Sequence, residues 1–344
     1  MRRIRVGGKD VYQVRPSHIM PYQIGHTSEI EPGLYMYCSG SSFDAVVHNH
    51  GHNQMFWWRA VISLGRNSIV GTTVKASEKM PVHLVVDEKH TQWYSEKIYV
   101  ATTVGNGCIL GSALAFQADE TCLREAYGEF ESEALALEPA YHPESVNTDG
   151  WGATQNTWKA LFGGSAGLLL CFLHAALKIQ DRCRRWEKKK ELMTKVWDCY
   201  KAKTLSCFSQ QLRRLREWVL QTPDMPDSAR GRVFDLCQRA NSFKRAYHYP
   251  KGHRTSNPLD RLMDFQDRFL YKMRYLHGDL LSGSANLMVR AIALMWNFHP
   301  FGAKTKRHSP FADLNHFVYH SNWLENLNIA ASLGGRYFDI NRMR

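Results

Sequence analysis

Two acidic residues stand where short apolar runs of the sequence end. Asp87 follows the run at residues 82–86, and Asp149 follows residues 145–148. Both runs favour β-structure, so each aspartate is expected at the end of a buried strand. A carboxylate there costs free energy unless a cation meets it, and two on neighbouring strands repel each other. The pair therefore indicates a shared divalent cation, and Mg²⁺ suits carboxylate and phosphate oxygens.

Each of the two aspartates also has a purely structural interpretation. Asp87 could cap its strand or pair with Lys89, and Asp149 could open an Asp-Gly turn with Gly150. Their joint position in one predicted sheet is what favours a chemical role.

A third acid is expected on a helix that begins near residue 256. Ser256 or Asn257 serves as the N-cap and Pro258 occupies the first helical position. Asp260 then lies in the first turn, where the helix macrodipole stabilises a carboxylate, although acids in first turns are commonly structural. Glu325, on another expected helix, is the rival for the third position.

The elements that must position these acids follow from the pattern of apolar residues. Strands are predicted over residues 82–87, 97–104 and 108–116, and the tripeptide at 105–107 (Gly-Asn-Gly) indicates a hairpin between the last two. A helix over 119–137, a strand over 145–148, a helix over 154–162 and a strand over 167–172 follow. Three antiparallel strands followed by a β-α-β unit, with acids on the first and fourth strands, describe an α/β fold with a ribonuclease-H-like mixed sheet.

The rest of the chain divides around this predicted core. Residues 175–250 have helical periodicity and many Lys and Arg residues, which predicts a basic all-α insertion between the fifth strand and the helix of the third acid. We therefore expect an N-terminal region and candidate DNA-binding segment at 1–80 and the first part of the catalytic core at 81–174. The remainder of the core and the C-terminal helices are expected at 251–344.

The charge of the chain favours a polyanionic partner. Lys and Arg number 44 against 32 Asp and Glu, a formal charge of +12, so nucleic acid is the first candidate. The basic residues expected to contact DNA phosphates lie in two blocks: Arg182, Arg184, Arg185, Lys188 and Lys189, then Arg213 and Arg214.

The cysteines and apolar stretches indicate the compartment. Eight cysteines contain no C-x-x-C pair, which leaves a zinc ribbon unsupported and suits a reducing cytoplasm. The first residues are charged rather than apolar, so no signal peptide is expected. The longest apolar stretch, at 166–177, is too short to span a bilayer. We expect a cytoplasmic protein with no membrane partner.

Four strings together, at residues 86–91, 146–151, 170–174 and 254–261, resemble prokaryotic insertion-sequence transposases. The resemblance is to the large DDE/D group related to the Mutator-like elements, and it runs from about residue 65 to the C-terminus. Cys171 and His174 match the C/D(2)H motif of several such families. The third acid of the family follows an asparagine on a helix after an α-helical insertion, which maps onto Asn257 and Asp260. The family usually has glutamate there, so the aspartate is a departure.

This resemblance implies an enzyme that cuts its own element's ends and joins them to target DNA. Two Mg²⁺ or Mn²⁺ ions would be held by Asp87, Asp149 and Asp260, with no organic cofactor. Cys171 and His174 would shape the pocket or contact the flanking strand, or else be a core thiol and a hydrogen-bonded core histidine.

The partners that the resemblance implies are double-stranded DNA at element ends and target, and a second copy in a homodimer at the nucleoid. Two other functions stay open: a metal-dependent DNA nuclease without strand transfer, and a non-catalytic DNA-binding protein derived from a transposase.

Overall fold

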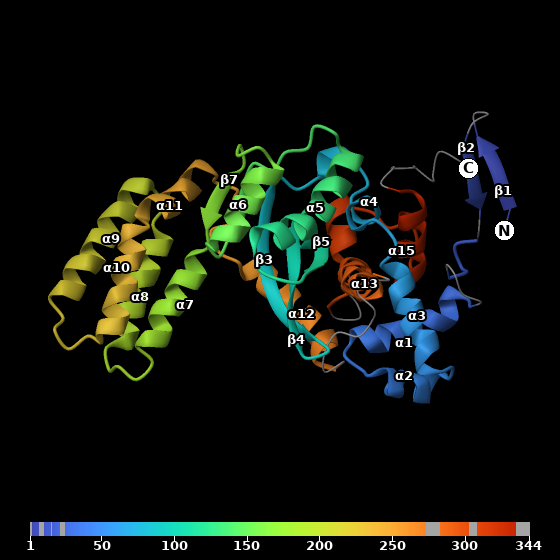
Figure 1. Ribbon diagram of the computed structural model, residues 1–344, viewed down its shortest axis with the longest axis horizontal. Coiled ribbons are helices and arrows are strands. Elements are labelled where there is room, and N and C mark those ends of the chain that lie inside the picture. Colours follow the sequence, from blue (N-terminus) through green and yellow to red (C-terminus); the bar gives the residue numbers. More distant parts are fainter. Residues whose placement is uncertain are drawn as a thin grey trace.

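A five-stranded mixed sheet forms the centre of the molecule (Figure 1). The computed structural model describes residues 2–6, 10–14, 16–20, 25–272, 283–302 and 308–334. The strands are β3 (His83–Trp93), β4 (Glu96–Gly105), β5 (Cys108–Ala115), β6 (Ser145–Thr148) and β7 (Gly167–Leu170), in the order β5-β4-β3-β6-β7. β3, β4 and β5 are antiparallel, whereas β6 and β7 run parallel to β3. The predicted mixed α/β sheet is confirmed.

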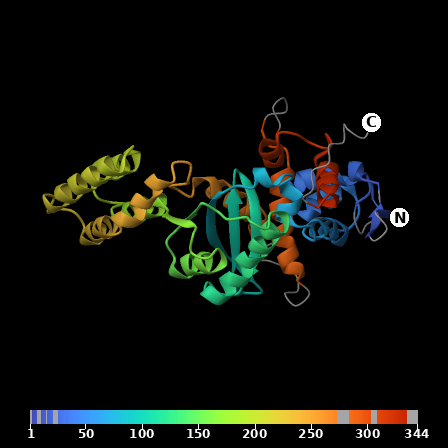
Figure 2. The same ribbon diagram turned by 90° about the horizontal axis from the view of Figure 1, so that it is seen from above.

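Helices cover both faces of this sheet because side chains alternate along each strand. Leu84 and Val86 of β3 share a core with α5 (Glu120–Leu137) and α6 (Gly152–Leu161). Figure 2 shows these two green helices on one side of the sheet. Val85 points to the other face, whose core includes residues of α12 (Asn257–Lys272) and α13 (Ser284–Phe298).

The segment between β7 and α12 is helical, as predicted, and forms the lobe at the left of Figure 1. Its elements are α7 (Phe172–Arg182), α8 (Lys189–Lys201), α9 (Leu205–Leu220), α10 (Asp227–Gln238), α11 (Ala240–Lys244) and the short 3-10 helix η2 (Arg245–His248). α7 contacts α8 and α10, and α9 contacts the same two helices, so the four surround a common core. α8 and α9 therefore lie across that core from the seam between α7 and α10.

The remaining helices belong to the segments before β3 and after α13. They are α1 (Thr27–Cys38), α2 (Phe43–His50), α3 (Gln54–Leu64), α4 (Ile69–Thr73), the 3-10 helix η1 (Ser77–Lys79), α14 (Pro310–Asn315) and α15 (Trp323–Ser332). A two-stranded antiparallel ribbon, β1 (Arg2–Val6) and β2 (Asp10–Val14), precedes them. Buried residues of α1 and α3 share one core with α12, α13 and α15, so the N-terminal helices pack as part of the central body.

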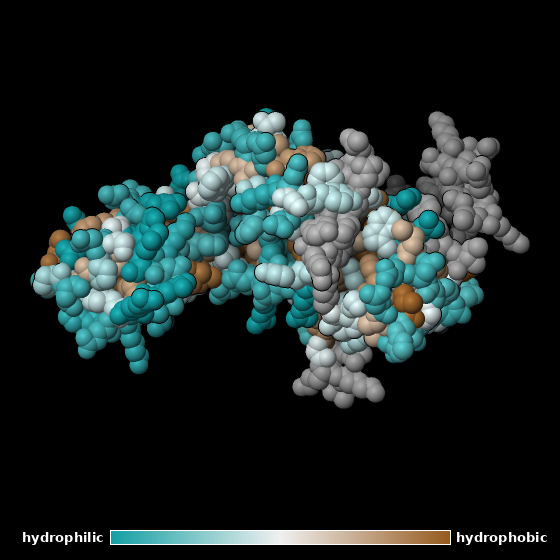
Figure 3. All heavy atoms as spheres, turned by 60° about the horizontal axis from the view of Figure 1, so that its bottom comes forward, coloured by the Kyte–Doolittle hydropathy of each residue, from teal (hydrophilic) through white to brown (hydrophobic). Residues whose placement is uncertain are grey.

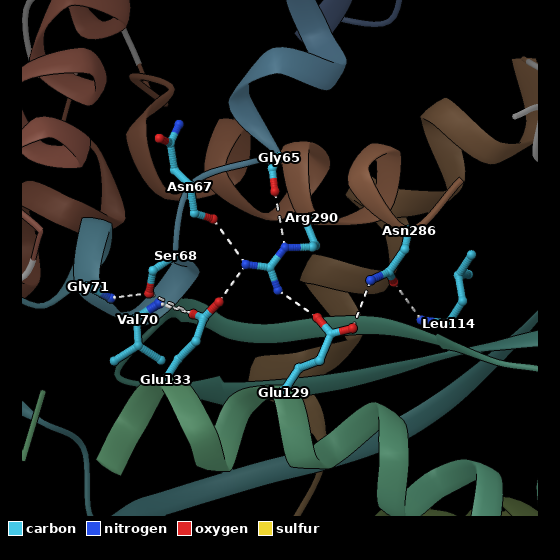
Figure 4. Close-up of polar contacts among 10 residues, drawn as sticks. All are labelled: Gly65, Asn67, Ser68, Val70, Gly71, Leu114, Glu129, Glu133, Asn286 and Arg290. Atoms are coloured by element: carbon cyan, nitrogen blue, oxygen red, sulfur yellow. Dashed lines mark hydrogen bonds and ion pairs between the residues drawn. The ribbon is translucent and has the colours of Figure 1, made fainter. Parts of the chain in front are cut away.

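An arginine joins three parts of this body (Figure 4). Arg290 of α13 is 12% exposed and donates to the carbonyl oxygens of Gly65 and Asn67, each at 3.0 Å. Its guanidinium also pairs with Glu129 Oε2 at 2.7 Å and with Glu133, both on α5. The cluster fastens α13 to α5 and to the turn that follows α3.

Two predicted strand ends are wrong. β3 continues to Trp93, so Asp87 is its fifth residue rather than its last; the buried part of the strand nevertheless stops at Val86. β7 ends at Leu170, and Cys171 caps the N-terminus of α7 instead of extending the strand. The apolar run across this boundary continues without a break, which is why the pattern of the sequence conceals it.

Candidate active site

The register of two neighbouring strands brings Asp87 and Asp149 together. β3 and β6 are adjacent and parallel, with Val85 opposite Asn147. Asp87 and Asp149 each come two residues later, which returns them to the same face. Backbones of paired strands lie about 5 Å apart, so the two carboxylates lie close enough to interact. The charge of Asp149 is one of the causes that raise the pKa of Asp87.

Local hydrogen bonds fix both aspartates. Asp87 Oδ1 accepts from the Glu88 amide at 2.8 Å, and Asp149 Oδ1 accepts from the Trp151 amide at 2.7 Å. Gly150, between Asp149 and Trp151, has a φ of +93°, a conformation that glycine adopts readily. Asp149 therefore does open an Asp-Gly turn, and that turn holds its carboxylate beside β3.

Asp260 approaches from α12, which lies along β3. Lys89 of β3 pairs with Asp267 of α12, and Gln266 donates to Thr102 of β4 at 3.3 Å. Lys89 lies two residues after Asp87 on β3, so both side chains face α12. Lys89 forms its ion pair with Asp267 of that helix and not with Asp87. Asp260 stands in the first turn of that helix, as expected, and its charge also raises the pKa of Asp87.

Cys171 links the end of β6, which precedes Asp149, to the start of α12, which carries Asp260. Its amide donates to the carbonyl of Thr148, the residue before Asp149, at 2.8 Å. Its Sγ accepts from the Ser256 amide at 3.2 Å. The Ser256 hydroxyl in turn donates to Asp260 Oδ1 at 3.4 Å. The thiol is buried and lies at the centre of this chain of contacts.

His174 supplies positive charge to the acidic cluster. Its hydrogen bond with the Cys171 thiol is the largest cause that raises its pKa to about 9; burial opposes the rise, and Asp87 and Asp149 add to it. The imidazole is therefore cationic at neutral pH. Burial is the main cause that raises the pKa of Asp87 and of Asp260, and the charge of His174 partly offsets both increases.

Glu88 belongs to the surroundings of the site and was not predicted. It follows Asp87 but faces the opposite side of the sheet, where it accepts from Tyr127 Oη at 2.7 Å and Thr154 Oγ1 at 2.8 Å. Burial raises its pKa to about 7, against the effect of these two hydrogen bonds. The alternation of the strand was a signal for this position, because it places an acid under α5 and α6. Asp264, one turn after Asp260, was missed as well; its charge raises the pKa of Asp260.

The rival third acid lies among different partners. Glu325 accepts from Ser17 Oγ at 2.6 Å and is 3.6 Å from His320 Nδ1. Its helix, α15, contacts α1, α4 and α13 and lies to the right of α13 in Figure 1, on the side away from the sheet. Asn257 is the exposed first residue of α12.

The predicted DNA-contacting residues all lie on the helical lobe. Several have carboxylate neighbours: Arg184 is 2.8 Å from Asp181, Lys188 is 3.0 Å from Asp224, and Arg213 is 3.7 Å from Glu217. The remaining four predicted residues are exposed or half-buried: Arg182, Arg185, Lys189 and Arg214.

The donor chemistry of the cluster suits a hard divalent cation. Asp87, Asp149 and Asp260 offer oxygen atoms, and a cation would relieve the repulsion that contributes to the raised pKa of Asp87. As they stand, no three His, Cys, Asp or Glu side chains within the described ranges are grouped closely enough to hold a metal ion.

Comparison with protein-family models and with curated proteins finds no match for this chain. In the described part of the chain, no helix has the length and apolar character needed to cross a membrane.

Proposed function

We propose that this chain is a DDE/D-type transposase that cuts DNA at the ends of its element and joins them to target DNA. The observation that carries the proposal is that Asp87 and Asp149 follow paired positions of adjacent parallel strands, with Asp260, at the start of α12, near enough for its charge to raise the pKa of Asp87. The strand order, with three antiparallel strands followed by two parallel ones, supports a ribonuclease-H-like core. The helical lobe between β7 and α12 agrees with the insertion that the resemblance implies.

The acids of the cluster would hold Mg²⁺, and the residues around them would orient their carboxylates for it. The metal, when bound, lowers the pKa of attacking water and stabilises the leaving oxygen. Asp87 and Asp149 are fixed by backbone hydrogen bonds, which leaves each a second carboxylate oxygen. Cys171 positions the strand end, Ser256 and the first turn of α12 relative to each other. The His174 imidazolium adds positive charge where a DNA phosphate would approach.

A homodimer follows from this chemistry, since joining two element ends to one target calls for two active sites. The positive charge of the whole chain favours the DNA partner without specifying a sequence.

The test uses a plasmid that carries the genomic DNA flanking the coding region on both sides. Incubation with the full-length protein, Mg²⁺ and a target plasmid should give nicked or excised DNA and then joined products. Hydrolysis without joining would assign the nuclease function instead. Binding with neither reaction would assign the non-catalytic DNA-binding protein and reject the proposal.

A further inference from the structure

A row of basic residues leads away from the carboxylate cluster along α7. His174, Lys178 and Arg182 are spaced four residues apart, so they lie on one face of the helix. At a rise of about 1.5 Å per residue, the row extends about 12 Å from His174. Lys178 and Arg182 are exposed. The row therefore begins beside Asp87 and ends on the outer surface of the lobe.

A second row lies on the adjoining helix. Arg239, which follows α10, lies against the Asp149 turn: a Cβ placed on Gly150 would overlap its guanidinium. Arg232 stands seven residues earlier, on the same face of α10. The second row thus also starts next to an acid of the cluster and runs outward.

The outer residues of the two rows line two adjoining hollows. An outer hollow of about 490 Å³ is lined by Lys178, Asp181, Arg182, Arg184 and Arg232. A smaller cavity of about 70 Å³ adjoins it, and Lys178, Arg232 and Arg239 line that one. Because Lys178 and Arg232 border both, we call the whole feature the α7–α10 groove. Figure 3 shows a mostly hydrophilic surface over the helical lobe.

The charge of the groove is positive despite two acids. Asp181 lies 2.8 Å from Arg184, and Asp235 lies 3.1 Å from Arg232. Lys178, Arg182 and Arg239 bring the cations to five against two carboxylates, a net charge of +3. The basic residues of α9, including Arg213 and Arg214, belong to the helix across the core of the lobe.

We propose that the α7–α10 groove holds the phosphate backbone of the DNA strand whose phosphodiester reaches the carboxylate cluster. The inference rests on the proposed function and names the surface that the substrate follows. A groove more than 10 Å long with cations on both walls matches a chain of phosphates better than a single small anion. Arg239 is the positioning residue nearest the site, and Lys178, Arg182 and Arg232 guide the strand outward. These contacts would be to the DNA backbone and would not select a base sequence.

The first test measures the salt dependence of DNA binding. Full-length protein binds a fluorescein-labelled 40-base-pair duplex of random sequence in EDTA, with KCl varied and fluorescence anisotropy as the readout. Each lost phosphate contact reduces the slope of log K against log[salt] by about 0.9. The triple variant Lys178→Ala/Arg232→Ala/Arg239→Ala should therefore reduce the slope by about 2–3 and the affinity at least tenfold. These positions are exposed, and circular dichroism checks that the variant folds.

A matched control removes the same charge from α8 and α9, at residues outside the groove and outside the two predicted DNA-contacting blocks. This α8–α9 variant, Lys190→Ala/Lys195→Ala/Arg216→Ala, should change the slope by less than about 1. Equal losses in both variants, or a larger loss in the α8–α9 variant, would contradict the proposed DNA-binding role of the groove.

A second measurement separates this inference from the proposed function. With Mg²⁺, the groove variant should raise KM for nicking, while nicking by the α8–α9 variant stays near wild type. If the groove variant nicks at the wild-type rate with an unchanged KM, the proposal that the groove binds DNA is rejected, while the transposase proposal is not affected. Absence of nicking in wild type, with the predicted slopes intact, would reject the transposase and keep the groove as a DNA-binding surface.

Discussion

Asp87 and Glu88 are neighbours in sequence, yet they act on opposite faces of the sheet. Asp87 faces Asp149 and α12, whereas Glu88 is enclosed by α5 and α6. The same strand thus carries a candidate metal ligand on one side and a buried acid on the other. Since Thr154 belongs to the first turn of α6, Glu88 also helps to fix the helix that follows the Asp149 turn.

We predict that Glu88→Gln stabilises the protein at pH 8. The folded pKa of about 7 lies above the ordinary 4.5, so the native state binds the extra proton between these values. Stability therefore falls as pH rises from 4.5 to 7, by about 3 kcal/mol for this group. Gln can still accept from Tyr127 and Thr154 and has no charge to bury. Urea unfolding at pH 5 and pH 8 measures the difference; a variant with the same pH dependence as wild type would contradict the assignment.

The charge of His174 gives a second prediction. Its pKa of about 9 exceeds the ordinary 6.5, so the imidazolium stabilises the fold fully below pH 6.5 and loses that effect as pH rises through 9. Cys171→Ala removes the largest cause and should lower the midpoint towards 6.5. A ¹⁵N-imidazole NMR titration of both proteins reads the midpoint. An unchanged midpoint in Cys171→Ala would mean that the thiol does not set the pKa.

At the scale of elements, the cluster around Arg290 holds the helices behind the sheet in place (Figure 4). Glu133 connects further to the start of α4, where its Oε2 accepts from Ser68 Oγ and from the Val70 amide, both at 2.9 Å. Asn286 joins Glu129 to the Leu114 amide of β5. α13 is thereby tied to α5, α4 and the edge strand at once.

We predict that Arg290→Met destabilises the protein by about 3 kcal/mol, because it leaves two partly buried carboxylates without their cation. Arg214→Met, on the exposed surface of α9, is the control and should change stability by less than about 0.5 kcal/mol. Urea unfolding of both variants tests this. Equal stabilities for Arg290→Met and wild type would show that the cluster adds nothing to the packing of α13.

The sequence predicts elements well where local signals are strong. The 145–148 strand and the 105–107 hairpin are both present; Asn106 and Gly107 have positive φ values, as the tripeptide indicates. The full length of β3 was not predictable, because its hairpin turns at Tyr94 and Ser95. These residues have positive φ without being Gly or Asn, so they carry no turn signal.

At the scale of the whole molecule, the sheet lies between the helical lobe and the N- and C-terminal helices (Figure 1). The carboxylate cluster is at the side of the sheet where the lobe begins, since α7 starts directly after β7. A DNA strand held on the lobe would therefore reach the acids without crossing the central body. Salt should weaken this binding strongly, given a net charge of +12.

The sequence supplies Asp87, Asp149, Cys171 and His174 as candidates, whereas it does not supply other residues around them. Asp87 and Asp149 end apolar runs, a local pattern. Asp264 and Arg239 acquire their places through packing of α12 and α10, which no local pattern records. Glu88 could have been identified, because the alternation of β3 places it under α5 and α6. Asp260 lies on α12 and Glu325 on α15, and the choice of Asp260 as the third acid stays a prediction.

The most direct measurement compares Mg²⁺-dependent nicking of the flanking-DNA plasmid by wild type and four variants. Asp87→Asn, Asp149→Asn and Asp260→Asn should each reduce nicking at least a hundredfold while duplex binding in EDTA stays within about threefold, since a lost metal ligand removes catalysis and not phosphate contacts. Glu325→Gln, the matched control on α15, should nick like wild type. Nicking that survives in Asp87→Asn or Asp149→Asn, or that is lost only in Glu325→Gln, would contradict the account.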